Sequence, residues 1–299
     1  MGQIDIQVDF EGDFELFMRN ELSSFGMPVN PDATREDVFV TYYDSMNRRV
    51  GAWKRKFFSA QGLVVPSELQ EALEAFKTKV ELGQDLTPHL SLGINRHHQP
   101  DGMLIDWGIY HFHLGIEPHP TAPGFVQRTD PILYAKVTDN AVYGITMTSH
   151  GAWADKELLE VLHAEFPDTL SRYRVEGILG VEHVATSNDH AQLRKAGVVS
   201  LVTLRDGTVY MPPGMGFTTN GRTSVNATMW MIRARKMIQK YQERVLQNAS
   251  KVASAITTET IKHSATLAPT YTLKLEIDNG TAFAAEYSLK LCWKLGPVP

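Results

Sequence analysis

The segment DWGIYHFHLG, residues 106–115, places two histidines on a strand-like pattern. Side chains of a β-strand alternate between its two faces, so Tyr110 and Phe112 point to one side while His111 and His113 point to the other. The aromatic side is expected to enter the core. Two imidazoles, spaced about 7 Å apart by the rise of a strand, are left on the opposite face. This pattern predicts a sheet with a histidine-bearing face.

Two further strands are predicted next to this one, at residues 132–137 and 142–148. A two-residue turn between them would place Lys136 on the apolar face, whereas a three-residue loop keeps every apolar side chain on one side. We favour the longer loop, which pairs Val137 with Tyr143. The face opposite the core then contains these polar side chains: His111, His113, Tyr134, Lys136, Thr146 and Thr148.

A third histidine, His150, follows these strands in the segment SHGAW, residues 149–153. In an antiparallel meander the third strand ends at the level where the first strand ends, so His150 is expected near His113. One alternative remains open at this point. In it, His111 and His113 are buried and hydrogen-bonded beneath a helix, for instance the helix predicted at residues 156–166.

Metal-free RNA cleavage is a chemistry that suits this face. It needs a base for the 2′-hydroxyl proton, an acid for the leaving oxygen and a cation for the strained phosphate. Histidines transfer protons near neutral pH. We therefore predict that His111, His113 and His150 act as acid and base, that Lys136 is the phosphate cation and that Tyr134 supports it. This mechanism needs no cofactor and no metal, and RNA is the expected partner.

Two other functions fit the same residues. A His-x-His strand with a distant third histidine can hold zinc, iron or nickel, which would make the protein a metal hydrolase. Against this, the chain has no cysteine cluster and no His-Glu-x-x-His helix, and Lys136 would repel a cation. The other alternative is a non-enzymatic binding or regulatory protein, in which the histidines are structural and a C-terminal hairpin pairs with a protein partner.

A basic cluster lies at residues 47–56, upstream of the histidine segment. Its cations surround Trp53, a combination that is typical of phosphate or single-strand contact. The predicted nucleic-acid-binding residues are Arg48, Arg49, Lys54, Arg55 and Lys56. The alternative is a solvated loop.

The composition is that of a folded protein with no strong overall charge. Of 299 residues, 43% are hydrophobic, which supplies a sizeable core and excludes a disordered or fibrous chain. The formal net charge of −5 gives no general attraction to nucleic acid or to an anionic membrane. The one cysteine, Cys292, cannot form an internal disulfide and is typical of a reducing compartment. Because the first residues lack a secretory signal and no segment approaches about 20 apolar residues, we expect a cytoplasmic protein without a membrane partner.

The predicted fold class is α+β, with a central antiparallel sheet flanked by helices, a long C-terminal helix and a terminal β-hairpin. Three segments are expected, namely an α/β part with the basic cluster (1–95), the histidine-bearing sheet (96–220) and the long helix with the hairpin (221–299). Residues 38–43 predict a strand, and residues 278–280, Asp-Asn-Gly, predict the hairpin turn.

The long helix, predicted at residues 224–248, carries a group of cations. We expect these to form a solvated face. They are Arg233, Arg235, Lys236, Lys240 and Arg244.

Four segments carry a limited resemblance to known proteins. They are DWGIYHFHLG (106–115), TDPILY (129–134), SHGAW (149–153) and LRKAG (193–197). Over roughly residues 35–245 the chain resembles a group of uncharacterised bacterial proteins from mobile-element and defence regions, which implies a role there but no agreed activity. A looser architectural similarity to sheet-based toxin ribonucleases of the RelE and barnase type implies acid, base and cation residues on a sheet face. Together these resemblances imply an RNA-cleaving enzyme of a toxin or phage-defence type, or a regulatory component of such a system.

Overall fold

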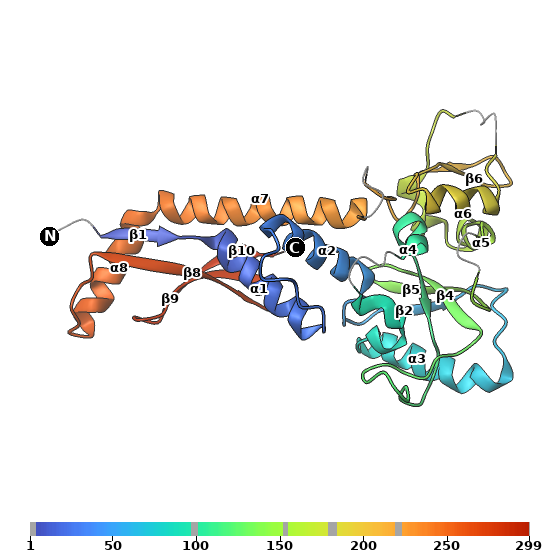
Figure 1. Cartoon of the computed structure of the whole chain (residues 1–299), viewed down its shortest axis with the longest axis horizontal. Coiled ribbons are helices and arrows are strands. Elements are labelled where there is room, and N and C mark those ends of the chain that lie inside the picture. The colour runs from blue at the N-terminus through green and yellow to red at the C-terminus, as the bar shows by residue number, and fades with distance from the viewer. Residues whose placement is uncertain (1–3, 97–100, 152–154, 179–183, 219–222, 299) are drawn as a thin grey trace. The chain divides into compact units, whose positions relative to one another are not determined.

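The computed structural model describes residues 4–96, 101–151, 155–178, 184–218 and 223–298 (Figure 1). They form two compact units. The central unit is Asp44–Thr228, and the terminal unit joins the two ends of the chain, Met1–Tyr43 and Met229–Pro299. This division differs from the expected boundaries at residues 95 and 220, because strands from both chain ends pair in one sheet.

A four-stranded sheet forms the middle of the central unit. Its strands are β2 (Lys56–Ser59), β3 (Ile109–Phe112), β4 (Ile132–Val137) and β5 (Ala141–Thr148). Their order is β2-β5-β4-β3. As predicted, β3, β4 and β5 form an antiparallel meander, and β2 lies parallel to β5.

The hairpin between β4 and β5 contains a bulge that the sequence did not predict. Next to the turn, Lys136 pairs with Tyr143, which is the register of the two-residue turn, so the three-residue loop that we favoured is wrong. Ile145 is then left unpaired in the bulge. Beyond it Tyr134 pairs with Thr146, which is the register that the longer loop required.

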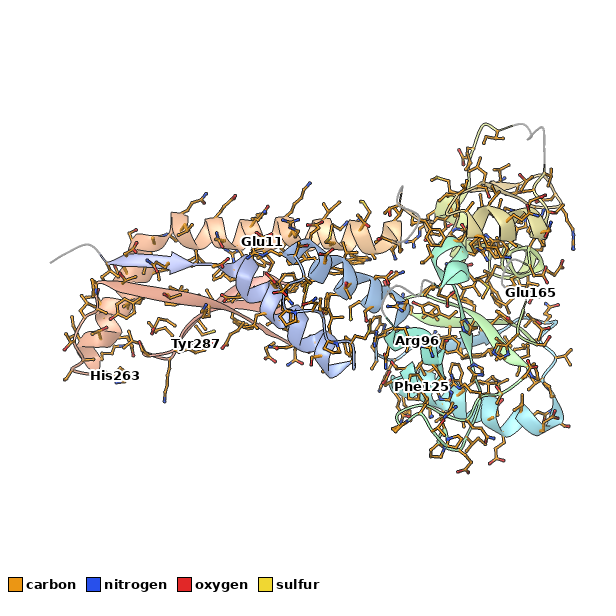
Figure 2. The ribbon with its side chains drawn as sticks, in the orientation of Figure 1. Glu11, Arg96, Phe125, Glu165, His263 and Tyr287 are labelled. Atoms are coloured by element: carbon orange, nitrogen blue, oxygen red, sulfur yellow. The ribbon has the colours of Figure 1, made fainter. Side chains whose placement is uncertain are left out.

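Apolar cores cover both faces of this sheet. The face that carries Phe112 packs against α3 (Gln70–Leu82), and the face that carries Ile109 and Tyr134 packs against α5 (Glu157–Glu165). Figure 2 shows side chains filling the space beside the strands. The open polar face that the sequence predicted is therefore covered in large part, because a second core lies over it.

Short elements surround the sheet of the central unit. They are η1 (Ser67–Leu69), η2 (Thr87–His89), η3 (Leu92–Asn95), α4 (Gly102–Trp107), η4 (Pro167–Thr169), η5 (Ser171–Tyr173), α6 (Ser187–Lys195), β6 (Val202–Thr203) and β7 (Val209–Tyr210). Asp106 and Trp107, expected at the start of the histidine strand, end α4 instead. Gly108 closes that helix with a φ of 66°, and Asp101 caps its first turn by accepting from the N–H of Leu104.

The terminal unit contains a second four-stranded sheet, in which the chain ends meet. Its elements are β1 (Asp5–Val8), α1 (Phe10–Ser24), α8 (Ala249–Lys262), β8 (Thr270–Asp278), β9 (Thr281–Glu286) and β10 (Leu291–Pro297). The strand order is β1-β8-β9-β10, with β1 parallel to β8. The predicted hairpin forms between β8 and β9 and turns at Asn279 and Gly280, both of which have positive φ.

Two long helices have residues in both units. They are α2 (Arg35–Arg48) and α7 (Val225–Gln247). The predicted long helix is confirmed as α7, but residues 38–43, predicted as a strand, lie inside α2. Val38, Phe39 and Tyr42 are buried at helical spacing, so a run of aromatic and β-branched residues here forms one face of a helix.

The architecture is α+β, as the sequence predicted. Within the part of the chain that the structure describes, no helix is long and apolar enough to cross a membrane.

Candidate functional site

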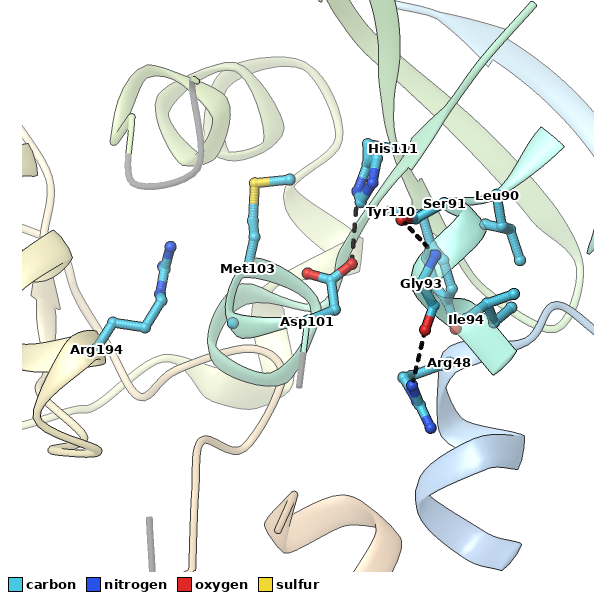
Figure 3. A pocket seen from close by; sticks show the side chains of 11 residues that line it. Arg48, Leu90, Ser91, Gly93, Ile94, Asp101, Met103, Tyr110, His111 and Arg194 are labelled. Atoms are coloured by element: carbon cyan, nitrogen blue, oxygen red, sulfur yellow. Dashed lines mark hydrogen bonds and ion pairs between the residues drawn. The ribbon is translucent and has the colours of Figure 1, made fainter. Parts of the chain in front are cut away.

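His111 lies in the wall of a pocket of about 400 Å³ in the central unit (Figure 3). The pocket is bounded by η3, the start of α4 and strand β3. Its lining residues are Arg48, Leu90, Ser91, Gly93, Ile94, Asp101, Gly102, Met103, Tyr110, His111 and Arg194. A volume of this size is in the range of small-molecule sites. Leucine, isoleucine, methionine and tyrosine side chains give it apolar walls, to which two arginines, an aspartate and a histidine add polar groups.

His111 faces the carboxylate of Asp101 within this pocket (Figure 3). The distance from Nδ1 of His111 to Oδ2 of Asp101 is 3.5 Å. The other oxygen of Asp101 accepts from the N–H of Leu104 at 3.0 Å, so the cap of α4 fixes the carboxylate. Burial lowers the pKa of His111, and the charge of Asp101 offsets part of this effect. The lowered pKa favours the neutral imidazole, which is held beside the carboxylate of Asp101.

His113 is buried, like His111. Its Nδ1 lies 3.0 Å from the carbonyl oxygen and 3.1 Å from the amide nitrogen of Thr129. Burial, together with the charge of Arg128, lowers the pKa of His113 to about 3. This ring stays neutral at physiological pH and does not serve as a proton donor there.

His150 lies beside His113, as the sequence predicted. The two ring centroids are 5.1 Å apart. Nδ1 of His150 lies 3.4 Å from Oδ1 of Asp130, and the side chain of His150 is 44% exposed. A charge on His150 lowers the pKa of both His111 and His113, so the three rings lie within range of one another's electrostatic field. The predicted histidine cluster is thus brought together, with a carboxylate beside each of its two outer members.

The other two predicted catalytic residues are placed differently. Tyr134 is the cross-strand neighbour of His111, but its side chain is buried in the apolar core under α5. Lys136 pairs with Ile109, and its Nζ lies 3.4 Å from the carbonyl oxygen of Trp107. Burial lowers the pKa of Lys136 to about 7. An amine enclosed in this way cannot contact a phosphate at the pocket, so the structure does not place Lys136 where the predicted mechanism needs it.

The predicted basic cluster does not form one exposed surface, because its three arginines are used inside the fold. Arg48 forms an ion pair with Asp44 and donates to backbone carbonyls. The guanidinium of Arg49 donates to Asn95, and that of Arg55 donates to the carbonyl of Thr138 and lies over Trp53. The exposed members are Lys54 and Lys56. Of this cluster, Arg48 lines the pocket beside His111.

Several residues of the site were not predicted from the sequence. Asp101 and Asp130 were missed, although an aspartate three residues before Leu104 is a recognisable helix-cap signal. Arg194 was also missed. It forms an ion pair of 3.0 Å with Asp106 and lies over the ring of Trp107. No local sequence pattern predicts this contact, because Arg194 is far from Asp106 and Trp107 in the sequence.

The alternative hypothesis was that the histidines bind a metal ion. Over the described residues, no group of three or more histidine, cysteine, aspartate or glutamate side chains is placed to hold a metal ion. The donors are arranged instead as two separate pairs of one imidazole and one carboxylate, Asp101 with His111 and Asp130 with His150.

Comparison with known proteins found no match: no family model, no curated protein and no solved structure is detectably similar to the chain.

Proposed function

We propose that the protein is a metal-independent nuclease that cleaves RNA at the pocket beside His111. One observation carries this proposal. Two imidazole–carboxylate pairs are present, Asp101–His111 and Asp130–His150. The ring of His150 lies 5.1 Å from that of His113, and the pair Asp101–His111 lines a pocket of about 400 Å³. Two histidines with separate carboxylate partners can divide the roles of base and acid between them.

We assign the base to His111 and the acid to His150. Neutral His111 takes the proton of the ribose 2′-hydroxyl, and the 2′-oxygen then forms a bond to phosphorus. The bond from phosphorus to the 5′-oxygen breaks, and protonated His150 gives its proton to that oxygen. Asp130 lies 3.4 Å from Nδ1 of His150 and orients the ring, and the products are a 2′,3′-cyclic phosphate and a free 5′-hydroxyl.

The remaining groups bind and position. Arg48 and Arg194 line the pocket, and we assign phosphate binding to them in place of Lys136. Arg48 is paired with Asp44 and Arg194 with Asp106, so a phosphate in the pocket competes with these carboxylates. His113 is a positioning residue, because its neutral ring packs against His150.

The deciding experiment is cleavage of a single-stranded RNA oligonucleotide in excess chelator. We expect products that end in a 2′,3′-cyclic phosphate, and loss of cleavage in both His111→Ala and His150→Ala. A matched oligonucleotide with 2′-deoxyribose throughout should resist cleavage, because it lacks the attacking hydroxyl. Absence of RNA cleavage by the wild-type protein between pH 5 and pH 9 would refute the proposal.

A toxin or phage-defence role in the cytoplasm is the setting that we propose for this activity. A single cysteine is consistent with a reducing compartment. Expression of the wild-type chain should then arrest growth of a bacterial host, and His111→Ala should relieve the arrest at equal protein level. Growth arrest that persists in His111→Ala would argue against toxicity by cleavage.

A binding role through the C-terminal strands is the second candidate. β10 is an edge strand of the second sheet, where it pairs with β9. Edge strands can pair with another chain. If this is the function, the mass measured by sedimentation should rise with protein concentration or with an added partner, and Trp293→Pro should prevent the rise.

A further inference from the structure

The outer face of α7 carries a line of cations in the terminal unit. Arg233, Lys236, Lys240 and Arg244 follow one another at intervals of three, four and four residues, which places them on one side of the helix. All four are exposed. We call these four residues together with the exposed Trp230 the α7 stripe. Figure 2 shows nitrogen-tipped side chains projecting from α7 on the side away from β1 and β8.

Most of these charges have no acidic partner. Among the residues that the structure describes, Arg233, Lys236 and Lys240 form no ion pair. The guanidinium of Arg233 lies over the ring of Trp230, with its Cζ 5.5 Å from the ring centroid. Arg235, on the same helix, is different. It forms ion pairs of 3.0 Å with Glu11 and 2.6 Å with Glu36. The fold thus neutralises Arg235 and leaves the outer row without recorded acidic partners among the described residues; Arg244, at the end of the row, also donates to the carbonyl of Leu295.

The opposite face of α7 is buried. Met231, Ala234, Ile238 and Val245 are each less than 7% exposed and hold the helix in its unit. An amphipathic helix that binds a lipid surface inserts its apolar face, and here that face is already occupied by the protein core. This arrangement favours a polyanion that lies along the outside of the helix over a bilayer.

The size of the stripe fits a nucleic-acid strand. Eleven residues separate Arg233 from Arg244, which corresponds to about 16 Å along a helix. At a rise of about 3.4 Å per nucleotide, this length spans roughly four or five phosphates of one strand. Trp230 is 39% exposed and adds an aromatic surface at one end. Cations in a row beside an exposed aromatic ring are the combination that single-strand-binding surfaces use.

We propose that the α7 stripe binds the backbone of single-stranded RNA, with Trp230 stacking on a base. A chain with a net charge of −5 has no general attraction for RNA, so binding of this kind requires a local concentration of positive charge. Binding of RNA to the α7 stripe does not require cleavage at His111.

The test is the affinity of the full-length His111→Ala protein for a fluorescent oligouridine RNA, measured by anisotropy over a series of salt concentrations. The His111→Ala background prevents cleavage during the measurement. With four phosphate contacts, the plot of log K against log salt should have a slope of about −2.8, and Lys236→Gln with Lys240→Gln should reduce its magnitude by about 1.4. Trp230→Ala should weaken binding about tenfold and leave the slope unchanged.

The matched control is Lys290→Gln with Lys294→Gln. These lysines are exposed in the same unit, and the substitutions change the net charge equally. Binding should be preserved in this control. The proposal is overturned if the control weakens binding as much as the α7 variant does, if RNA does not bind at low salt, or if the α7 substitutions abolish binding to phosphatidylserine vesicles while binding to RNA is unchanged.

Discussion

At the scale of single residues, the site depends on carboxylates that lie beside two histidines, Asp101 beside His111 and Asp130 beside His150. Asp101 has two tasks, because one oxygen caps α4 and the other faces His111. The spacing of the histidines was readable from the alternation of a strand. Asp101 and Asp130 could not be predicted as partners of the histidines, because they approach His111 and His150 through tertiary contacts alone.

The substitution Asp101→Asn separates these two tasks. Asparagine still caps the helix, so the free energy of unfolding should change by less than about 1 kcal/mol. Cleavage should fall about 100-fold, because the imidazole of His111 loses the partner that orients it. The charge of Asp101 raises the pKa of His111, so its removal should also shift the acid limb of the profile of kcat/KM against pH to lower pH. An acid limb that does not move would show that His111 is not the base.

Lys136 gives a second prediction at this scale. Burial lowers its pKa from 10.5 in the reference state to about 7. Between these values the unfolded chain binds the extra proton, so stability rises with pH from about 7 to about 10, and the cost of burying the amine is largest below the folded-state pKa. Lys136→Met should therefore stabilise the protein most below pH 7, on the order of 4 kcal/mol, and much less near pH 10.

Urea unfolding of both proteins at pH 6, 8 and 10 measures this difference. Other titrating groups contribute equally to both chains, so the difference between them isolates Lys136. If the wild type and Lys136→Met differ by the same amount at every pH, then Lys136 is not a buried neutral amine.

At the scale of elements, the glycine-rich segment after β7 closes the end of α4. Gly214 donates its N–H to the carbonyl of Asp106 at 2.9 Å, and Gly216 donates to the carbonyl of Ile105 at 2.8 Å. These carbonyls lie in the last turn of α4, where a helix offers them no N–H donor, and the segment supplies the missing hydrogen bonds. The approach is close enough that a Cβ on Gly214 would lie 2.4 Å from the carbonyl oxygen of Ile105.

Gly214→Ala should consequently destabilise the central unit by about 2–3 kcal/mol, because backbone and not a flexible side chain must move. Gly124→Ala is the control. Gly124 has a φ of 84° and no atom near its missing Cβ, so alanine there should meet strain alone, about 1 kcal/mol. Denaturant unfolding compares the two. An equal loss of stability in the two variants would mean that the backbone next to Gly214 has room for a Cβ atom.

Helices, strands and turns were predicted from the sequence better than the side chains that pack over them. The meander, the long helix and the Asn279–Gly280 turn follow from local periodicity and turn chemistry, which act over a few residues. Two failures have physical causes that are not local. Residues 38–43 have strand-forming composition but form a helical face, and the bulge at Ile145 changes the register of a hairpin that its turn alone does not fix.

At the scale of the whole molecule, the chain divides into a central unit and a unit built from both ends. No local signal predicted this division, because β1 and β8 are separated by most of the chain and become neighbours through pairing alone. The division has a functional meaning for both proposals. Every lining residue of the pocket lies in Asp44–Thr228, whereas the α7 stripe lies in the terminal unit.

The fragment of residues 44–228 should therefore fold and cleave RNA on its own. Both imidazole–carboxylate pairs and both apolar cores of the four-stranded sheet are contained in it. We expect cooperative thermal unfolding by circular dichroism and a kcat of the same order as that of the full chain. Because the fragment lacks the α7 stripe, its KM for RNA at low salt should rise, and the salt dependence of kcat/KM should weaken by a slope of up to about 2.8. A fragment that folds but does not cleave RNA would mean that the site needs the terminal unit, whereas unchanged salt dependence would remove the α7 stripe from RNA binding.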